Sequence, residues 1–224
     1  PQCYPKPEIQ AKITSPIESE DIPSLEQIYT SDWQATSHPI WAISEQHAWS
    51  LLDDFIEDRV EHYQTERDFP HIEGTSQLSS YLNIGILSIR QCIQVLFRSQ
   101  NGYFQIESTG QQTWLDELLW REFYQHILFD FPRVSKHLPF KINTQNIPWR
   151  NAPDDLNAWQ TAQTGIPIVD AGMRQMLATG WMHNRVRMIV AMFLCKNLLI
   201  DWRQGEQWFM QHLIDGDLAA NNGG

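Results

Sequence analysis

The sequence holds only three cysteines in 224 residues, Cys3, Cys92 and Cys195. They are too few and too widely spaced for a disulfide framework or a C-x-x-C metal site, so we expect reduced thiols. The eight histidines form no H-E-x-x-H motif and no close pair. We therefore predict a protein without a bound metal.

Long hydrophobic runs are also missing. The longest, MIVAMFLC, covers residues 188–195, whereas a helix that spans a membrane needs about 20 apolar residues. No signal peptide is recognisable near the first residue. We expect a cytoplasmic protein, associated with the nucleoid if it is bacterial, that works away from membranes.

Neither of the two common glycine-rich phosphate motifs, G-x-G-x-x-G and G-x-x-x-x-G-K-[ST], occurs in the sequence. Any nucleotide must therefore be held without a Rossmann or P-loop device. The alternation of apolar and polar residues that marks strands and hairpins is absent too, and no repeat is visible.

The acidic excess is confined to one part of the chain. The net charge is −11, and residues 1–74 alone carry 15 Asp and Glu against 4 Lys and Arg. Residues 75–224 hold 12 of each kind, so their charge balances. An acidic total therefore does not exclude a locally basic surface that binds nucleic acid.

Residues 1–43 read as an interdomain linker. Six of the twelve prolines fall within residues 1–39, among Ser, Thr and Glu, with no sustained hydrophobic period. The chain begins with Pro1 rather than Met, and we expect it to be a fragment of a longer protein. The domain proper is predicted to begin at Ser44.

From residue 44 onward the pattern is helical, and we predict an all-α domain. AWSLLDDFIEDRVEHY, residues 48–63, has apolar residues at helical spacing with acids between them. Further helices are predicted over residues 79–97, 113–128, 168–178, 183–199 and 205–214. Pro167 and Thr179-Gly180 mark the ends of one of them, and Gly205 precedes the last.

The segment TGWMHNRVRMIVAMFLCKNLLIDW, residues 179–202, carries two different faces when drawn as one helix. One face is apolar and contains Val186, Ile189, Val190, Phe193 and Leu194. The other presents Asn184, Arg187, Met188 and Ala191, at i, i+3, i+4 and i+7. Such a helix can line a polar pocket, or it can be a core helix with one arginine that reaches solvent. The segment alone favours neither.

WLDELLWREFYQH, residues 114–126, places Trp114, Glu117 and Arg121 on one stripe and Trp120 and Tyr124 beside it. The aromatic side chains of such a surface can stack on a heteroaromatic ring, and the carboxylate and the arginine beside them can hydrogen-bond to its edge. Core packing with an ordinary i, i+4 ion pair explains the same residues, and by itself this segment favours that explanation.

Hydroxyl side chains precede a predicted helix in EGTSQLSSYL, residues 73–82. Thr75, Ser76, Ser79 and Ser80 can hold a phosphate at a helix N-terminus. Ordinary capping explains them as well and is the commoner case.

The last ten residues, DGDLAANNGG, do not fit a calcium loop. An EF-hand needs an oxygen ligand at position 5 and glycine at position 6 of the loop, where this sequence has Ala219 and Ala220.

Taken together, these segments resemble the DNA photolyase/cryptochrome family. The resemblance is strongest in TGIPIVDAGMRQMLATGWMHNRVRMIVAMFL and LLIDWRQGEQWFMQHLIDGDLAANNGG, and it covers roughly residues 44–224. It implies the helical FAD-binding domain of a photolyase, incomplete at its C-terminus, with the N-terminal α/β antenna domain absent. The full-length protein is then expected to carry a second, antenna chromophore of folate or deazaflavin type.

The resemblance also assigns residues to the cofactor. Asn221 would reach flavin N5, and Arg187 would pair with Asp215. The residues expected to contact FAD are Tyr63, Thr75, Ser76, Leu78, Ser79, Trp114, Arg121, Arg187, Asp215, Gly216, Asp217 and Asn221.

A second set of residues would receive the DNA lesion. Asn184 and Met188 stand where the enzymes that repair (6-4) lesions carry two histidines, which points to the cyclobutane class. The residues expected to contact DNA are Arg67, Glu117, Trp120, Asn184, Arg185 and Met188. Glu117 would act on the substrate during repair.

The implied reaction is light-driven repair of cyclobutane pyrimidine dimers by electron transfer from reduced FAD, carried out by a monomer, a deoxyribodipyrimidine photo-lyase. An extruded dimer would stack on Trp120. Trp149 and Trp202 match two of the three tryptophans that carry electrons to the flavin in this family, and the third would follow Gly224. A cryptochrome, which senses blue light without repair, is the alternative, and a helical remnant that holds no FAD is a third possibility.

Overall fold

The computed structural model describes residues 41–42, 44–98, 106 and 108–223. The described helices all belong to one compact unit, residues 44–224. The predicted linker lies outside the described residues, apart from Trp41 and Ala42, and it stays a prediction.

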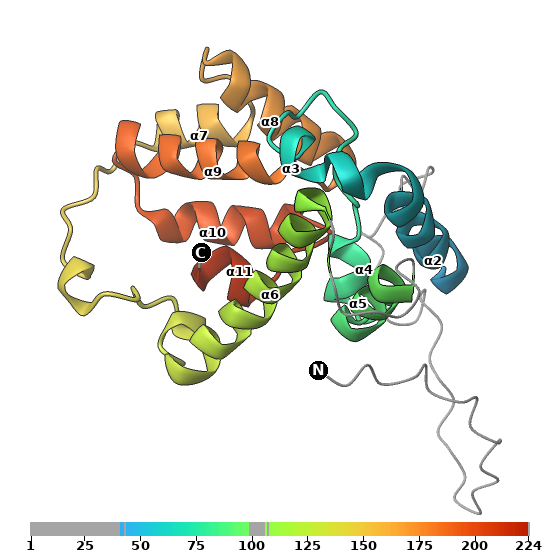
Figure 1. The fold of residues 1–224 in the computed structure, drawn as a ribbon. Helices are drawn as coiled ribbons and strands as arrows, with labels where there is room; N and C mark the ends of the chain where they lie inside the picture. Colours follow the sequence, from blue (N-terminus) through green and yellow to red (C-terminus); the bar gives the residue numbers. More distant parts are fainter. Residues whose placement is uncertain (1–40, 43, 99–105, 107, 224) are drawn as a thin grey trace, which may run out of the picture. The chain divides into compact units, whose positions relative to one another are not determined.

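All regular structure in the described part of the chain is helical, so the all-α prediction is confirmed (Figure 1). The α-helices are α2 (Glu45–Asp54), α3 (Tyr63–Glu66), α4 (Ser79–Asn83), α5 (Ile89–Arg98), α6 (Thr109–Asp130), α7 (Pro153–Gln160), α8 (Pro167–Thr179), α9 (Asn184–Met192), α10 (Trp202–His212) and α11 (Leu218–Gly223). Three short 3-10 helices are described, η2 (Val60–His62), η3 (Val134–Lys136) and η4 (Ile142–Thr144). Two short π-helices are η1 (Phe55–Arg59) and η5 (Phe193–Asn197).

Two buried apolar clusters hold these helices together. The first is formed by α2, η1, α4, α5 and the start of α6, where the Phe55 ring lies 5.7 Å from that of Tyr63 and 5.2 Å from that of Trp114. The second is formed by α7 to α10 around Trp159, whose indole N–H donates to the Val190 carbonyl. Burial of apolar surface is the main stabilising force in both.

The prediction of one helix over residues 79–97 is wrong in one respect, because the structure has two helices there, α4 and α5. Gly85 lies between them with a φ of +79°, in the left-handed region that ends helices. Ser88 then caps α5, since its hydroxyl accepts from the Gln91 N–H. The turn signals in this stretch outweigh its continuous apolar spacing.

Gly205 does not precede the last predicted helix but lies inside α10. The helix begins at Trp202, where the Asp201 side chain accepts from the Arg203 N–H as a cap. A Cβ on Gly205 would come within 2.6 Å of Leu194 Cδ2, so the glycine lets α10 approach η5 closely. Two short helices, α7 and α11, were not predicted.

The predicted ends of α8 are confirmed. Pro167 occupies its first turn, and Gly180 closes it with a φ of +70°. The apolar face predicted for residues 183–199 is only partly right. Val186 and Val190 are buried, but Ile189 is 42% exposed, and the α-helix changes into the π-turn η5 at Phe193.

Candidate functional site

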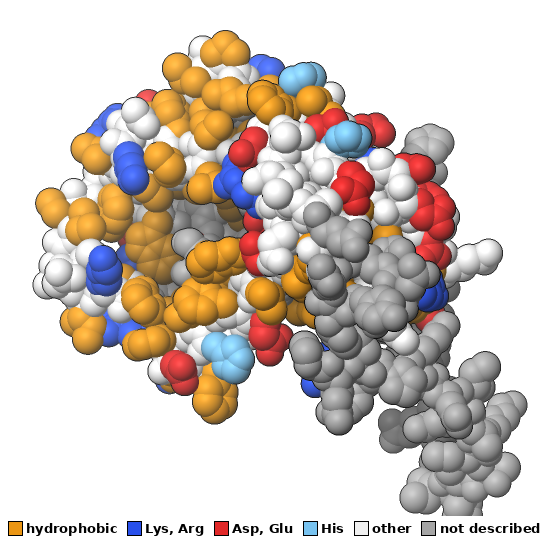
Figure 2. Space-filling model, in the orientation of Figure 1, with side chains coloured by type: hydrophobic (Ala, Val, Ile, Leu, Met, Phe, Trp, Pro, Cys, Tyr) orange, Lys and Arg blue, Asp and Glu red, His pale blue; other side chains and the backbone are white. Residues whose placement is uncertain are grey.

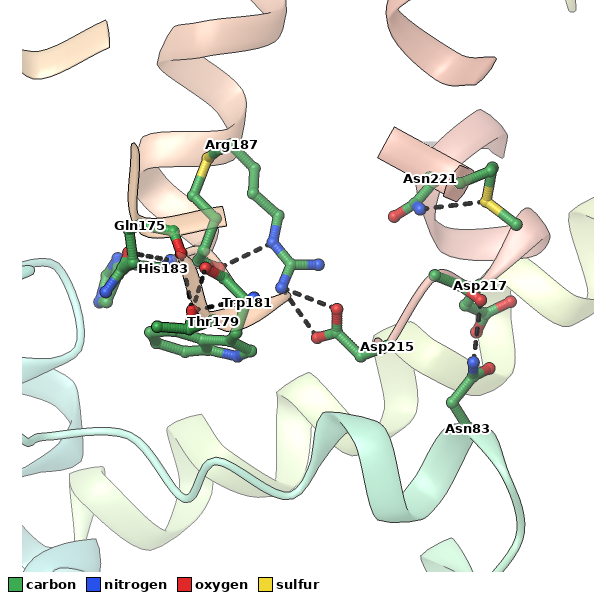
Figure 3. Close-up of polar contacts among 12 residues, drawn as sticks. Asn83, Gln175, Thr179, Trp181, His183, Arg187, Asp215, Asp217 and Asn221 are labelled. Carbon is green, nitrogen blue, oxygen red and sulfur yellow. Dashed lines mark hydrogen bonds and ion pairs between the residues drawn. The ribbon is translucent and has the colours of Figure 1, made fainter. Parts of the chain in front are cut away.

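A buried ion pair joins α9 to the loop before α11. The Arg187 guanidinium donates to both carboxylate oxygens of Asp215, at 2.9 and 2.8 Å, and its Nε donates to the Met182 carbonyl at 2.7 Å. The Asp215 side chain is only 2% exposed. Figure 3 shows the arginine reaching across to this carboxylate, so the predicted contact between Arg187 and Asp215 is present.

Asp217 links the same loop to two other elements. Its Oδ1 accepts from the Ala219 N–H at 3.0 Å and so caps α11. Its Oδ2 lies 3.0 Å from Nη1 of Arg121 on α6, as an ion pair without hydrogen-bond geometry. Each buried carboxylate of the loop is therefore matched by one guanidinium, as buried charges require.

Asn83, the last residue of α4, also holds this loop, and the sequence analysis did not find it. Its side-chain amide donates to the Gly216 carbonyl at 2.8 Å, and Figure 3 shows it pointing from α4 toward the loop. Asn83 lies inside the helix predicted over residues 79–97, so no local pattern pointed to this role.

The hydroxyl-bearing loop lies directly before α4. Thr75, Ser76 and Ser79 are half-buried, and the buried Ser80 hydroxyl has no hydrogen-bond partner among the described residues. Arg59 in η1 secures the loop, because its guanidinium donates to the Thr75 carbonyl at 3.3 Å. An unpartnered buried hydroxyl fits a site that binds a polar ligand.

Three predicted cofactor residues belong largely to the first apolar cluster. Leu78 is only 1% exposed as a whole residue, so it offers almost no open surface to a ligand. Tyr63 and Trp114 are buried as well. Burial, together with the nearby Glu117 carboxylate, raises the pKa of Tyr63 to about 12, so this phenol is neutral at physiological pH.

Three of the six predicted DNA-binding residues, Arg67, Glu117 and Arg185, take part in a row of ionic contacts between the end of α3, α6 and α9. Arg67 forms an ion pair with Glu117 on α6. Arg185 on α9 donates to Asp68 at 2.6 Å, and its Nη1 lies 3.5 Å from the Met188 sulfur. The sequence analysis missed Asp68 as a member of these ionic contacts, because the Arg67–Asp68 dipeptide looks like a solvated charge pair.

Trp120 and Met188 are half exposed, and Asn184 is exposed. The Trp120 ring packs on the rings of Phe123, at 5.3 Å, and Tyr124, at 6.0 Å. The site therefore offers exposed apolar surface beside charged groups, which suits extruded bases.

Trp149 and Trp202 lie in neighbouring segments. The N–H of Arg150, next to Trp149, donates to the Leu199 carbonyl at 2.8 Å, close before Trp202. The Arg203 guanidinium lies 4.8 Å from the centre of the Trp202 ring. No ring contact between the two tryptophans is found in the described part of the chain.

Asn221 on α11 points toward α10, where its amide nitrogen lies 3.4 Å from the Met210 sulfur (Figure 3). Sulfur is a weak acceptor, so this amide can exchange the contact for a better partner. The described residues contain no group of three or more His, Cys, Asp or Glu that could hold a metal ion. Nor is any helix among them long and apolar enough to cross a membrane.

Residues 114–224 match the family model described as the FAD binding domain of DNA photolyase. The chain is 46% identical, over all 224 residues, to the deoxyribodipyrimidine photo-lyase of Escherichia coli K12. It belongs to the DNA photolyase family. Its helices therefore form a domain of the photolyase FAD-binding type.

Two solved structures of this family show the same fold. One is a bacterial class III photolyase from Agrobacterium tumefaciens, with a TM-score of 0.77 and 42% identity over 82% of this chain and 37% of that one. The other is a cryptochrome from Synechocystis, with a TM-score of 0.74 and 33% identity over 82% of this chain and 38% of that one. The chain spans 46% of the length of its Escherichia coli relative.

Proposed function

We propose that the protein repairs cyclobutane pyrimidine dimers in DNA by light-driven electron transfer from reduced FAD. The observation that carries the proposal is the assembly of Arg67, Glu117, Arg185 and Met188, which come from the end of α3, from α6 and from α9 and are connected through Asp68. In a light sensor without a DNA substrate, nothing would require this combination.

The cofactor site proposed here lies between three segments. The hydroxyls of residues 75–79 would accept the phosphates and adenosine, and Arg121 would face the cofactor from α6. Asp215 and Asp217 would turn toward the flavin ring, with Gly216 between them, and Asn221 would exchange its sulfur contact for flavin N5. When bound, reduced FAD supplies the electron after it absorbs light.

The substrate site would use the exposed side chains beside it. Arg67 and Arg185 would bind phosphates, Trp120 would stack on the extruded dimer, and Asn184 and Met188 would pack against its bases. Glu117, which is paired with Arg67, would accept hydrogen bonds from a base edge.

A repair assay tests this proposal. The reduced, FAD-loaded protein is mixed with a thymine-dimer oligonucleotide under blue light. The ultraviolet absorbance of thymine is followed and compared with a dark control. Light-dependent recovery of absorbance is expected. No recovery by FAD-loaded protein would rule out repair.

Glu117→Ala should lower the repair yield by about tenfold or more while FAD stays bound, because it removes a contact to the substrate and not to the cofactor. Repair per absorbed photon and the bound-FAD absorbance are measured together. Glu122→Ala, an exposed acid on the same helix, serves as control and should change neither. Loss of FAD in Glu117→Ala would show that Glu117 is wrongly assigned to the substrate site.

A cryptochrome-type blue-light sensor is the second candidate, favoured by the similarity to the Synechocystis cryptochrome. It would bind FAD and respond to light without recovering thymine absorbance. The same assay therefore separates the two candidates.

The remaining expectations belong to this proposal. They are an antenna chromophore in the full-length protein, a monomeric state, a linker over residues 1–43 and a helical FAD- and DNA-binding domain from Ser44. They also include electron transfer through Trp149 and Trp202, and a cytoplasmic location, associated with the nucleoid if the protein is bacterial.

A further inference from the structure

Asp68 connects the two arginines that are proposed to bind DNA phosphates. It follows Arg67 at the end of α3, and its Oδ1 accepts from Arg185 Nε at 2.6 Å. The same oxygen lies 3.9 Å from Arg67 Nε. Arg185 comes from α9, 117 residues later in the chain, so this contact depends on the fold.

The local charges cancel. Arg67 is paired with Glu117 and Arg185 with Asp68, so both guanidiniums already have a carboxylate partner in the free protein. Arg185 donates to Asp68 through its Nε, the kind of donor that a phosphate oxygen also accepts from. The side chain of Asp68 is 52% exposed and that of Arg185 36% exposed, so an incoming anion can reach the pair.

Asp68 is also held in its charged form. The hydrogen bond from Arg185 keeps the pKa of its carboxyl below the usual range, against the smaller opposing effect of burial. At neutral pH the residue therefore presents a full negative charge to Arg185.

We propose that Asp68 is an internal competitor of DNA: in the free protein its carboxylate occupies the place on Arg185 that a backbone phosphate takes in the complex. The proposal rests on the DNA-binding function proposed above. Asp68 thereby lowers the affinity for DNA in general and allows the repaired strand to leave faster.

The salt dependence of binding gives this proposal a distinctive consequence. An arginine that binds a phosphate releases about one counterion from DNA, which adds about −0.9 to the slope of log K against log salt. If the phosphate displaces Asp68, the freed carboxylate attracts a cation from solution, which offsets that release. Removing the carboxylate should therefore strengthen binding and also steepen the slope.

The test compares wild type with Asp68→Asn by fluorescence anisotropy, using a dimer-containing duplex and an undamaged duplex at several salt concentrations. Asp68→Asn should lower the Kd for both duplexes by about two- to fivefold, the range expected for an exposed ion pair. The salt slope should become more negative by up to about 0.9.

Two further variants keep the test specific. Asp54→Asn removes the same charge at an exposed position of α2 with no ion pair among the described residues, and near 0.15 M salt it should leave the Kd unchanged. Arg185→Gln in the Asp68→Asn background should abolish the gain. Circular dichroism confirms that each variant is folded. If Asp68→Asn does not fold, Asp68→Glu, which keeps the charge, is measured as well and should bind DNA like wild type.

Each outcome decides the matter. An unchanged or weaker affinity in Asp68→Asn would overturn the proposal, and a weaker affinity would make Asp68 a positioning residue for Arg185. An equal gain in Asp54→Asn would reduce the effect to net charge and overturn it too. If the wild type did not bind the dimer-containing duplex at all, the proposed function would fail too. That result differs from a failure of the Asp68 proposal alone, in which the wild type still binds DNA.

Discussion

Single residues from distant parts of the chain fix the loop of residues 215–217. Arg187 from α9 and Arg121 from α6 pair with its two carboxylates, and Asn83 from α4 binds the carbonyl between them. Breaking a buried pair leaves an unmatched charge, which costs far more than an exposed pair contributes. The loop therefore has one well-defined position from which its acids can face a cofactor.

Replacing Asn83 by Asp should weaken FAD binding, because the substitution removes the donor to the Gly216 carbonyl and places two acceptors together. The lost bond is worth about 1 kcal/mol, so the Kd for FAD should rise about fivefold. Fluorescence of released FAD measures this change. Asn157→Asp, an exposed position on α7, is the control and should have no effect. Unchanged affinity in Asn83→Asp would show that the loop keeps its position without this bond.

Asp170 should make the stability of the domain depend on pH. Its burial opposes ionisation, but hydrogen bonds from Thr164 and Gly165 outweigh this effect and lower the pKa of the carboxyl. A lowered folded-state pKa contributes stability above the unfolded value of about 4, and that contribution is lost as pH falls through the folded-state pKa.

Asp170→Asn should therefore lower the free energy of unfolding at pH 7 by about 1–3 kcal/mol, since a charged acceptor of three hydrogen bonds becomes neutral. Urea unfolding at pH 7 and at pH 3 measures the difference from wild type, which should shrink at the lower pH. Asp58→Asn, on an exposed side chain, should show no such difference. A gap between wild type and Asp170→Asn that stays constant with pH would contradict the assignment.

At the scale of helices, glycines set how closely neighbours approach. A Cβ on Gly172 of α8 would lie 2.4 Å from Val186 Cγ1 and 3.2 Å from Val190 Cγ2, both on α9. Because α9 carries Asn184, Arg185, Arg187 and Met188, this contact sets the position of one wall of the candidate site. A helix pattern read from sequence counts glycine only as a weak helix former and misses this role.

Gly172→Ala should destabilise the domain by about 1–3 kcal/mol through overpacking, despite the better helix propensity of alanine. Thermal unfolding measures the loss. Val186→Ala makes room for the added methyl group, so the double variant should be more stable than the sum of the two single effects predicts. Strict additivity would mean that the two helices do not meet at this contact.

At the scale of the whole domain, the described residues include two kinds of acidic side chains, exposed ones and ones that are paired with an arginine. Figure 2 shows acidic side chains gathered over α2 and η1, where Asp54, Glu57 and Asp58 are exposed. In the candidate site each arginine faces a carboxylate, so the local charge is close to balanced. The net charge of −11 therefore says little about the surface that is proposed to bind DNA.

Because the proposed cofactor site joins α4, α6 and the 215–217 loop, FAD should stabilise the whole domain. At free FAD about 100 times its Kd, the free energy of unfolding should rise by about 2.7 kcal/mol. Thermal unfolding with and without FAD measures this, and riboflavin, which lacks the phosphates and adenosine, should stabilise much less. Equal stabilisation by both ligands would argue against a role for residues 75–79.

The sequence by itself determined the helical class, the ends of α8 at Pro167 and Gly180, and the family. Periodicity and caps involve residues a few positions apart, so they can be read along the chain. The break at Gly85 was equally local, but its apolar neighbours concealed it. Only the tertiary structure decided that Asp68 meets Arg185, 117 positions away, and that Asn83 meets Gly216, 133 positions away. Such contacts depend on how whole helices pack, and no spacing within one segment encodes them.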